Sequence, residues 1–97
     1  MEKVAKLSKL KEKNCIKIKG KELALFKIGN KLYCTDNLCT HAQGQLCEGN
    51  LQGTLIECPW HNSKFDVISG KVKNPPAREN LKTYKITIKE DDVYINI

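Results

Sequence analysis

The feature that most restricts the fold is a segment that combines cysteine and histidine at short spacing. Residues 39–66, CTHAQGQLCEGNLQGTLIECPWHNSKFD, contain three of the five cysteines and both histidines of the chain. The pairs Cys39-x-His41 and Cys58-x-x-His61 are separated by sixteen residues. Thiolates and imidazoles are ligands of transition-metal sites. A fold that uses all four must bring two separate loops together.

Length and composition indicate one globular domain, residues 1–97, with 40% hydrophobic residues. The longest apolar run is LALF, residues 23–26, and the N-terminal fifteen residues lack the apolar core of a secretory signal. We therefore expect a cytoplasmic protein without a membrane partner. Thiols stay reduced in that compartment, so clustered cysteines indicate metal ligands rather than disulfides. The odd number of cysteines supports the same interpretation.

Positive charge surrounds the Cys/His segment and avoids it. Residues 1–31 carry ten lysines and three glutamates, whereas residues 32–63 carry no lysine or arginine and three acids. This distribution argues against a nucleic-acid partner, although the net charge is +6. We interpret the lysines as the solvated faces of strands; docking of an acidic redox partner is the alternative.

Alternation of apolar and polar residues predicts an all-β chain of short antiparallel strands, arranged as a sandwich or small barrel. The segment at 22–28 is apolar on both faces, which predicts a deeply buried strand. Gly29–Asn30 and Ser69–Gly70 predict hairpin turns, and Pro75 with Pro76 predicts a rigid loop. The expected strands or hairpins lie at residues 4–10, 15–19, 22–28, 31–35, 54–58, 64–72, 81–89 and 93–97.

Two cofactors fit two cysteines and two histidines. Zinc accepts this ligand set, but zinc-finger sequences place a cysteine pair first and a histidine pair later, on a helix. Here each glycine-bearing loop supplies one residue of each type, and no helix is predicted. A two-iron cluster, with two thiolates on one iron and two imidazoles on the other, suits this order better.

In these residues the chain resembles the Rieske-type [2Fe–2S] proteins, particularly the small soluble ferredoxins associated with oxygenases. The resemblance covers Cys39-Thr40-His41 and Cys58-Pro59-Trp60-His61, and continues through NSKFD, Gly70 and the PPA loop. It implies a Rieske-like antiparallel β-sandwich or small barrel, with a cluster-binding subdomain inserted at about residues 36–70. It also implies one [2Fe–2S] cluster per chain. The implied ligands are Cys39, His41, Cys58 and His61.

Departures from the respiratory and photosynthetic branch favour the soluble branch. That branch has a disulfide between the two loops, and its positions are occupied here by Gly44 and Trp60. We expect Cys47 to be a free thiol, as well as Cys15 and Cys34, which lie in strand patterns and are interpreted as core residues.

The resemblance also suggests which residues surround the cluster. Ser63 stands where the high-potential branch has a serine that donates to a bridging sulfide, whereas Phe65 replaces a tyrosine donor; this predicts a lower reduction potential. Trp60 is interpreted as a space-filler for the missing disulfide, or alternatively as a docking contact. Pro75 and Pro76 are expected to form a loop that shields the cluster, or a simple rigid turn.

The function implied by the resemblance is one-electron transfer, without catalysis by the chain itself. The donor would be a flavin-containing NAD(P)H-dependent reductase, and the acceptor a terminal oxygenase. Two alternatives remain open: a small Rieske-type subunit of an assimilatory nitrite reductase, and a structural zinc module. An intrinsic oxygenase is excluded, because both histidines are already used as ligands.

Overall fold

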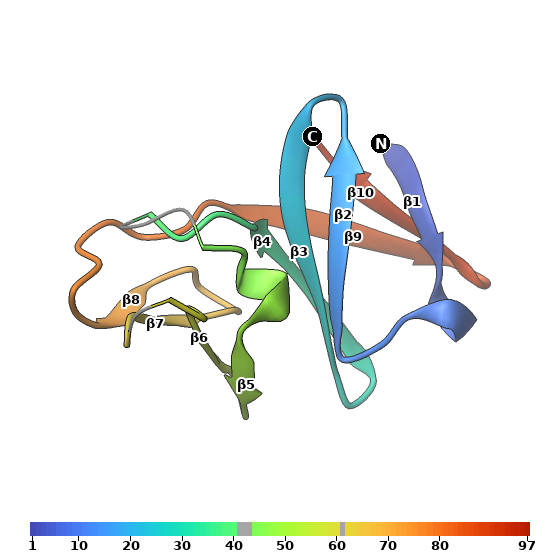
Figure 1. Ribbon diagram of the computed structural model, residues 1–97. Helices are drawn as coiled ribbons and strands as arrows, with labels where there is room; N and C mark the ends of the chain where they lie inside the picture. The colour runs from blue at the N-terminus through green and yellow to red at the C-terminus, as the bar shows by residue number, and fades with distance from the viewer. Residues whose placement is uncertain (41–43, 61) are drawn as a thin grey trace.

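Two antiparallel sheets make up the structure, a computed structural model that describes residues 1–40, 44–60 and 62–97 (Figure 1). The larger sheet has six strands in the order β1-β10-β9-β4-β3-β2. Its strands are β1 (Glu2–Lys6), β2 (Lys13–Ile18), β3 (Lys21–Ile28), β4 (Lys31–Asp36), β9 (Thr83–Lys89) and β10 (Asp92–Asn96). Both chain termini lie at this sheet, on the side away from the smaller one (Figure 1).

The smaller sheet has four strands in the order β5-β6-β7-β8 and is inserted between β4 and β9. Its strands are β5 (Asn50–Gln52), β6 (Leu55–Glu57), β7 (Lys64–Asp66) and β8 (Val72–Asn74). Two 3-10 turns complete the described elements: η1 (Leu7–Lys9) and η2 (Leu46–Glu48). The expected all-β arrangement of short antiparallel strands, with a subdomain inserted between two of them, is confirmed. Within the described residues no helix has the length and apolar character needed to cross a bilayer.

Strand β3 separates two hydrophobic cores, which explains why its sequence is apolar on both faces. Leu23 and Leu25 face a core inside the six-stranded sheet, with Val93 and Ile95 of β10. Because side chains alternate along a strand, Ala24 and Phe26 face the opposite way. They meet a second core formed with the smaller sheet and its loops, which includes Cys39 and Cys58. The prediction of a deeply buried strand at this position is therefore confirmed.

The six-stranded sheet curls until its edge strands approach each other. Val4 of β1 and Ile16 of β2 pack against the same core, although the two strands stand at opposite ends of the strand order. Lys19, after β2, forms an exposed ion pair of 2.9 Å with Glu2 of β1. An exposed pair of this kind contributes little to stability. The shared core, rather than this ion pair, keeps the sheet nearly closed.

The predicted hairpins are present, whereas some short elements were not predicted. β3 and β4 pair with Ile28 opposite Lys31, so Gly29–Asn30 forms the two-residue turn, with Gly29 at φ +61°. β7 pairs with β8 around the turn that contains Ser69–Gly70. The weak pattern at residues 4–10 resolves into the end of β1 followed by η1. Strand β5 and turn η2 had no distinct sequence signal.

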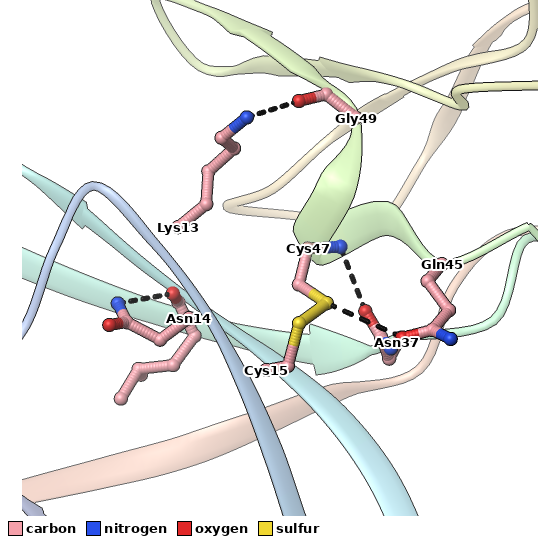
Figure 2. The surroundings of a disulfide bond; sticks show 8 residues. Lys13, Asn14, Cys15, Asn37, Gln45, Cys47 and Gly49 are labelled. Atoms are coloured by element: carbon pink, nitrogen blue, oxygen red, sulfur yellow. Dashed lines mark hydrogen bonds between the residues drawn. A yellow bond between two sulfur atoms is a disulfide. The ribbon is translucent and has the colours of Figure 1, made fainter.

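The expectation of free thiols at Cys15 and Cys47 is wrong. These residues form a disulfide between β2 and η2, with Cα atoms 5.3 Å apart and a sequence separation of 32 (Figure 2). Local spacing could not reveal this pairing, because it depends on η2 lying beside the edge strand β2. Cys34 is buried outside the disulfide, as expected for a core residue.

A comparison of two isoleucines on neighbouring strands tests the core inside the six-stranded sheet. Ile95 is fully buried, whereas Ile88 is 42% exposed. We expect Ile95→Ala to lower the free energy of unfolding by about 2–5 kcal/mol, because truncation of a buried side chain leaves a cavity. The same change at Ile88 should cost less than about 1 kcal/mol. Urea unfolding followed by circular dichroism measures both, and equal losses would contradict the assignment of the core.

Candidate metal centre

The first candidate loop is a narrow hairpin that begins where β4 ends. The backbone N–H of Leu46 donates to the carbonyl of Asn37 over 2.7 Å, and Leu38 pairs with Gln45 in an isolated bridge. The N–H of Cys39 donates to the carbonyl of Gly44 over 2.9 Å. These bonds fix Cys39 at the end of a short ladder. His41 lies beyond it, outside the described residues.

Asn37 holds the base of this hairpin with its side chain. The residue is almost fully buried, and its Oδ1 accepts the backbone N–H of Cys47 over 2.8 Å. Its own backbone N–H donates to the carbonyl of Glu22, in the strand β3, over 3.0 Å. A buried amide with these partners connects the loop to the larger sheet. Its only sequence signal was a polar residue two positions before a candidate ligand.

The second candidate loop connects β6 with β7. The N–H of Cys58 donates to the carbonyl of Ser63 over 2.9 Å, which closes the base of this loop next to two paired strands. Cys58 is 2% exposed. His61, which follows Trp60 in sequence, is outside the described residues.

Gly44 is the point at which the two loops meet. A Cβ atom placed on Gly44 would lie 2.9 Å from Cys58 Sγ and 3.3 Å from Trp60 Cγ. The same residue accepts the backbone hydrogen bond of Cys39. Two cysteines from different loops therefore approach one glycine, and only the absence of a side chain there allows this contact.

A third segment, residues 74–79, contacts both loops. Asn74 Nδ2 donates to the carbonyl of Asn62 over 2.7 Å. The N–H of Ala77 donates to Ser63 Oγ over 2.9 Å. On the other side, Thr40 Oγ1 donates to the carbonyl of Glu79 over 2.8 Å. The segment thus packs across the region that contains both candidate cysteines.

The loop residues Pro75 and Pro76 belong to this third segment and are joined by a cis peptide bond. They line a shallow surface hollow together with Trp60, Asn62 and Asn74. This placement beside the second loop is compatible with a shielding role, which stays a prediction.

The residues expected around the cofactor lie at the second loop. Ser63 is fully buried, and because its oxygen accepts from Ala77, its hydroxyl hydrogen can donate to another acceptor. Phe65 is fully buried in the core beneath the loop. Trp60 lies beside Gly44, because a Cβ placed on that glycine would be 3.3 Å from Trp60 Cγ, but the side chain is 66% exposed. The indole therefore lies where the two loops approach each other and also presents a large apolar surface. Its role as a space-filler stays a prediction.

The chemistry of the two cysteines favours a metal. Cys39 and Cys58 are buried among apolar side chains, where an isolated thiolate would be costly. A cation between them would offset that cost, and cysteine coordinates metals as the thiolate. Cys34 differs, since burial raises the pKa of its thiol to about 12. Cys34 belongs to the core of the larger sheet, away from the two loops.

Comparison with known proteins agrees with this geometry. The Rieske [2Fe-2S] domain family matches residues 1–85. The chain belongs to this family. Its cofactor is accordingly a Rieske-type [2Fe–2S] cluster, and two buried cysteines in facing loops fit such a group. Zinc is thereby excluded as the primary cofactor.

Individual relatives are similar along most of the chain. The ferredoxin component of the naphthalene 1,2-dioxygenase system of Pseudomonas putida is 43% identical over 82 residues, which cover 84% of this chain and 79% of the relative. The Sphingomonas yanoikuyae B1 ferredoxin has a similar structure, with a TM-score of 0.92, 33% identity, and coverage of 98% and 96% of the two chains. The ferredoxin complexed with the oxygenase of carbazole 1,9a-dioxygenase has a TM-score of 0.90, 32% identity, and coverage of 96% and 89%.

Replacement of Gly44 by alanine tests the contact between the loops. The new Cβ would press on Cys58 Sγ and on the Trp60 ring. Because overpacking costs about 1–3 kcal/mol, we expect the iron content per purified chain to fall several-fold. Gly29→Ala serves as the control, since it adds a Cβ at a positive φ but in open space. Full iron content in Gly44→Ala would contradict the proposed closeness of the loops.

Proposed function

We propose that this Rieske protein is a ferredoxin that carries single electrons from a flavin-containing NAD(P)H-dependent reductase to a terminal oxygenase. We further propose that Cys39 and Cys58 bind one iron of the cluster, and that His41 and His61 bind the other. The bound cluster supplies a reversible one-electron couple. The polypeptide itself performs no conversion of an organic substrate, and we place it in the cytoplasm.

The observation that carries this proposal is the convergence of Cys39 and Cys58 on Gly44. Both sulfurs belong to buried residues, whereas the adjacent Trp60 is largely exposed. A cofactor held by these cysteines would lie close to the protein surface, at the end of the molecule formed by the loops. Electron transfer to a partner needs such a short path between the cofactor and the contact surface.

The names of the relatives support the choice of partners. The relatives compared above include a ferredoxin component of a dioxygenase system and a ferredoxin found in complex with its oxygenase. We infer a similar acceptor for this chain. The reductase follows from chemistry, because nicotinamide cofactors deliver hydride, and a flavin is needed to divide the two electrons into single steps.

Substitution of the proposed ligands tests their roles separately. Even loss of an outer partner of a ligand lowers metal affinity about 10–100-fold, so we expect His41→Ala, His61→Ala and Cys58→Ser each to lower iron content at least about tenfold. Iron and acid-labile sulfide analysis, with EPR of the reduced protein, gives the measurement. Cys34→Ala should retain two irons and two sulfides per chain. A histidine variant with an unchanged Rieske spectrum would rule out this ligand set.

The carrier role has its own test. With excess NADH and a flavoprotein reductase of a dioxygenase system, we expect bleaching of the wild-type visible spectrum to correspond to one electron per chain. Anaerobic stopped-flow absorbance measures this reaction. A cluster-loaded chain that no such reductase reduces would contradict the proposed donor while leaving the ligand assignment intact.

A Ser63→Ala substitution tests the hydrogen bond from its hydroxyl group. Loss of a donor to the cluster disfavours the more negative, reduced state, so the reduction potential should fall. Loss of the acceptor for the Ala77 N–H should also lower the free energy of unfolding by about 1–3 kcal/mol. Protein-film voltammetry and urea unfolding separate the two effects, with Ser69→Ala in the exposed turn as control. An unchanged potential would show that Ser63 has only the structural role.

A further inference from the structure

The disulfide Cys15–Cys47 joins the two parts of the molecule at one point. Cys15 lies on β2, which is an edge strand of the six-stranded sheet and pairs only with β3. Cys47 lies in η2, which follows the first cluster loop. Figure 2 shows the sulfur–sulfur bond crossing from the strand to the turn. The bond therefore fixes the base of the first loop to the larger sheet.

The two halves of the disulfide differ in their access to solvent. Cys15 is exposed, whereas Cys47 is 5% exposed. Thiol–disulfide exchange requires attack of a thiolate on a sulfur that it can reach, so Cys15 is the half open to attack. Lys13 and Lys17 lie on the same face of β2, two positions to either side. Positive charge near a cysteine favours its thiolate form and hence exchange.

Cys47 is connected to the candidate ligand Cys39 by a short series of contacts. The N–H of Cys47 donates to Asn37 Oδ1 (Figure 2). The backbone carbonyl of Asn37 also accepts the N–H of Leu46. The ladder continues through the bridge between Leu38 and Gln45 to the bond between Cys39 and Gly44. A shift of Cys47 would therefore be transmitted to the position of Cys39 and to the Gly44 contact.

The surroundings of the disulfide are able to accommodate the reduced state. Lys13 Nζ donates to the carbonyl of Gly49, so a second link between β2 and the η2 region remains when the sulfurs separate. Gln45 Oε1 lies 3.9 Å from Cys47 Sγ, where it can accept a hydrogen bond from a thiol (Figure 2). Opening of the bond should thus loosen the first loop without unfolding the chain.

We propose that Cys15–Cys47 is a redox-sensitive latch that controls how firmly the first loop holds the cluster. Its reductant is a protein or small-molecule dithiol. One thiolate of the dithiol attacks Cys15 Sγ, the sulfur–sulfur bond breaks, and Cys47 leaves as a thiolate that takes up a proton. The second thiolate of the reagent then displaces Cys15, which is also protonated. Two electrons and two protons pass to the protein, and the dithiol becomes a disulfide.

This role goes beyond electron transfer by the cluster and does not depend on which partners the ferredoxin uses. Disulfides that form in a reducing compartment are usually transient or redox-sensing. A permanent disulfide would be unusual in the cytoplasm, where we have proposed to place the chain. A disulfide that opens, with one exposed half, is consistent with that placement.

The experiment uses the cluster-loaded protein with graded ratios of reduced to oxidised dithiothreitol under anaerobic conditions. Alkylation followed by mass spectrometry reports the thiol state of Cys15 and Cys47. Absorbance during incubation with an iron chelator reports the rate of cluster loss. We expect both thiols to appear together, and the rate of cluster loss to rise about tenfold as the disulfide opens, since a disulfide typically contributes more than this factor to stability.

Three variants make the result specific. Cys15→Ser removes the exposed half, and Cys15→Ala with Cys47→Ala removes both; each should lose the cluster rapidly, with no dependence on dithiothreitol. Cys34→Ala removes a buried thiol away from the latch and should behave like the wild type. If the double variant does not load, Cys15→Ser alone gives the comparison.

Other outcomes would overturn the proposal. Alkylation of both cysteines before any dithiol is added would show that the latch does not form. Opening of the disulfide without a change in the rate of cluster loss would show that it does not act on the first loop. An equal acceleration by dithiothreitol in Cys15→Ser would show that the reagent acts on the cluster directly.

Discussion

The structure depends on bringing two cysteine side chains out of water at one place. A thiolate in an apolar environment is costly unless a cation compensates its charge, and both Cys39 and Cys58 are buried. Their loops can meet only where one backbone approaches the other without a side chain, and Gly44 provides that position. The cationic irons of the family's cofactor would offset the cost of burying the two thiolates, while the fold brings the two cysteines to the same place. The fold and the cofactor therefore depend on each other.

The larger sheet provides the rigid support for this arrangement. β3 contributes Leu23 and Leu25 to one core, and Ala24 and Phe26 to the other. The cluster-binding region thus packs on one face of β3, and the other face of β3 is held in the core of the larger sheet. Hydrogen bonds from residues 74–79 then connect the two loops from the side. Both β3 and residues 74–79 support the loops, so the geometry of the loops does not depend on their own short sequences alone.

Features of the fold that depend on local sequence patterns could be predicted from the sequence. The run at 22–28, apolar on both faces, and the alternation along 81–89 each predict a strand, and Gly29–Asn30 predicts a turn, because each signal depends on neighbouring residues. The spacing of the four candidate ligands pointed to the correct family for the same reason. The disulfide between Cys15 and Cys47 escaped prediction, because its partners meet only after two sheets have packed. The role of Asn37 also depends on distant partners, the backbone of Glu22 and of Cys47.

The disulfide of this chain lies at a different place from the disulfide that joins the two loops in the respiratory branch. In the respiratory branch that the chain resembles, a disulfide joins the positions of Gly44 and Trp60; here the two residues lie close together, since a Cβ on Gly44 would be 3.3 Å from Trp60 Cγ. The covalent bond of this chain lies instead at the base of the first loop, on the side of the larger sheet. A disulfide at the tip would need a cysteine in place of Trp60, whereas the disulfide at the base leaves Trp60 in place and 66% exposed. The disulfide thus restrains the loop that carries Cys39 on the side of the larger sheet, whereas the exposed indole of Trp60 leaves an apolar surface where the two loops meet.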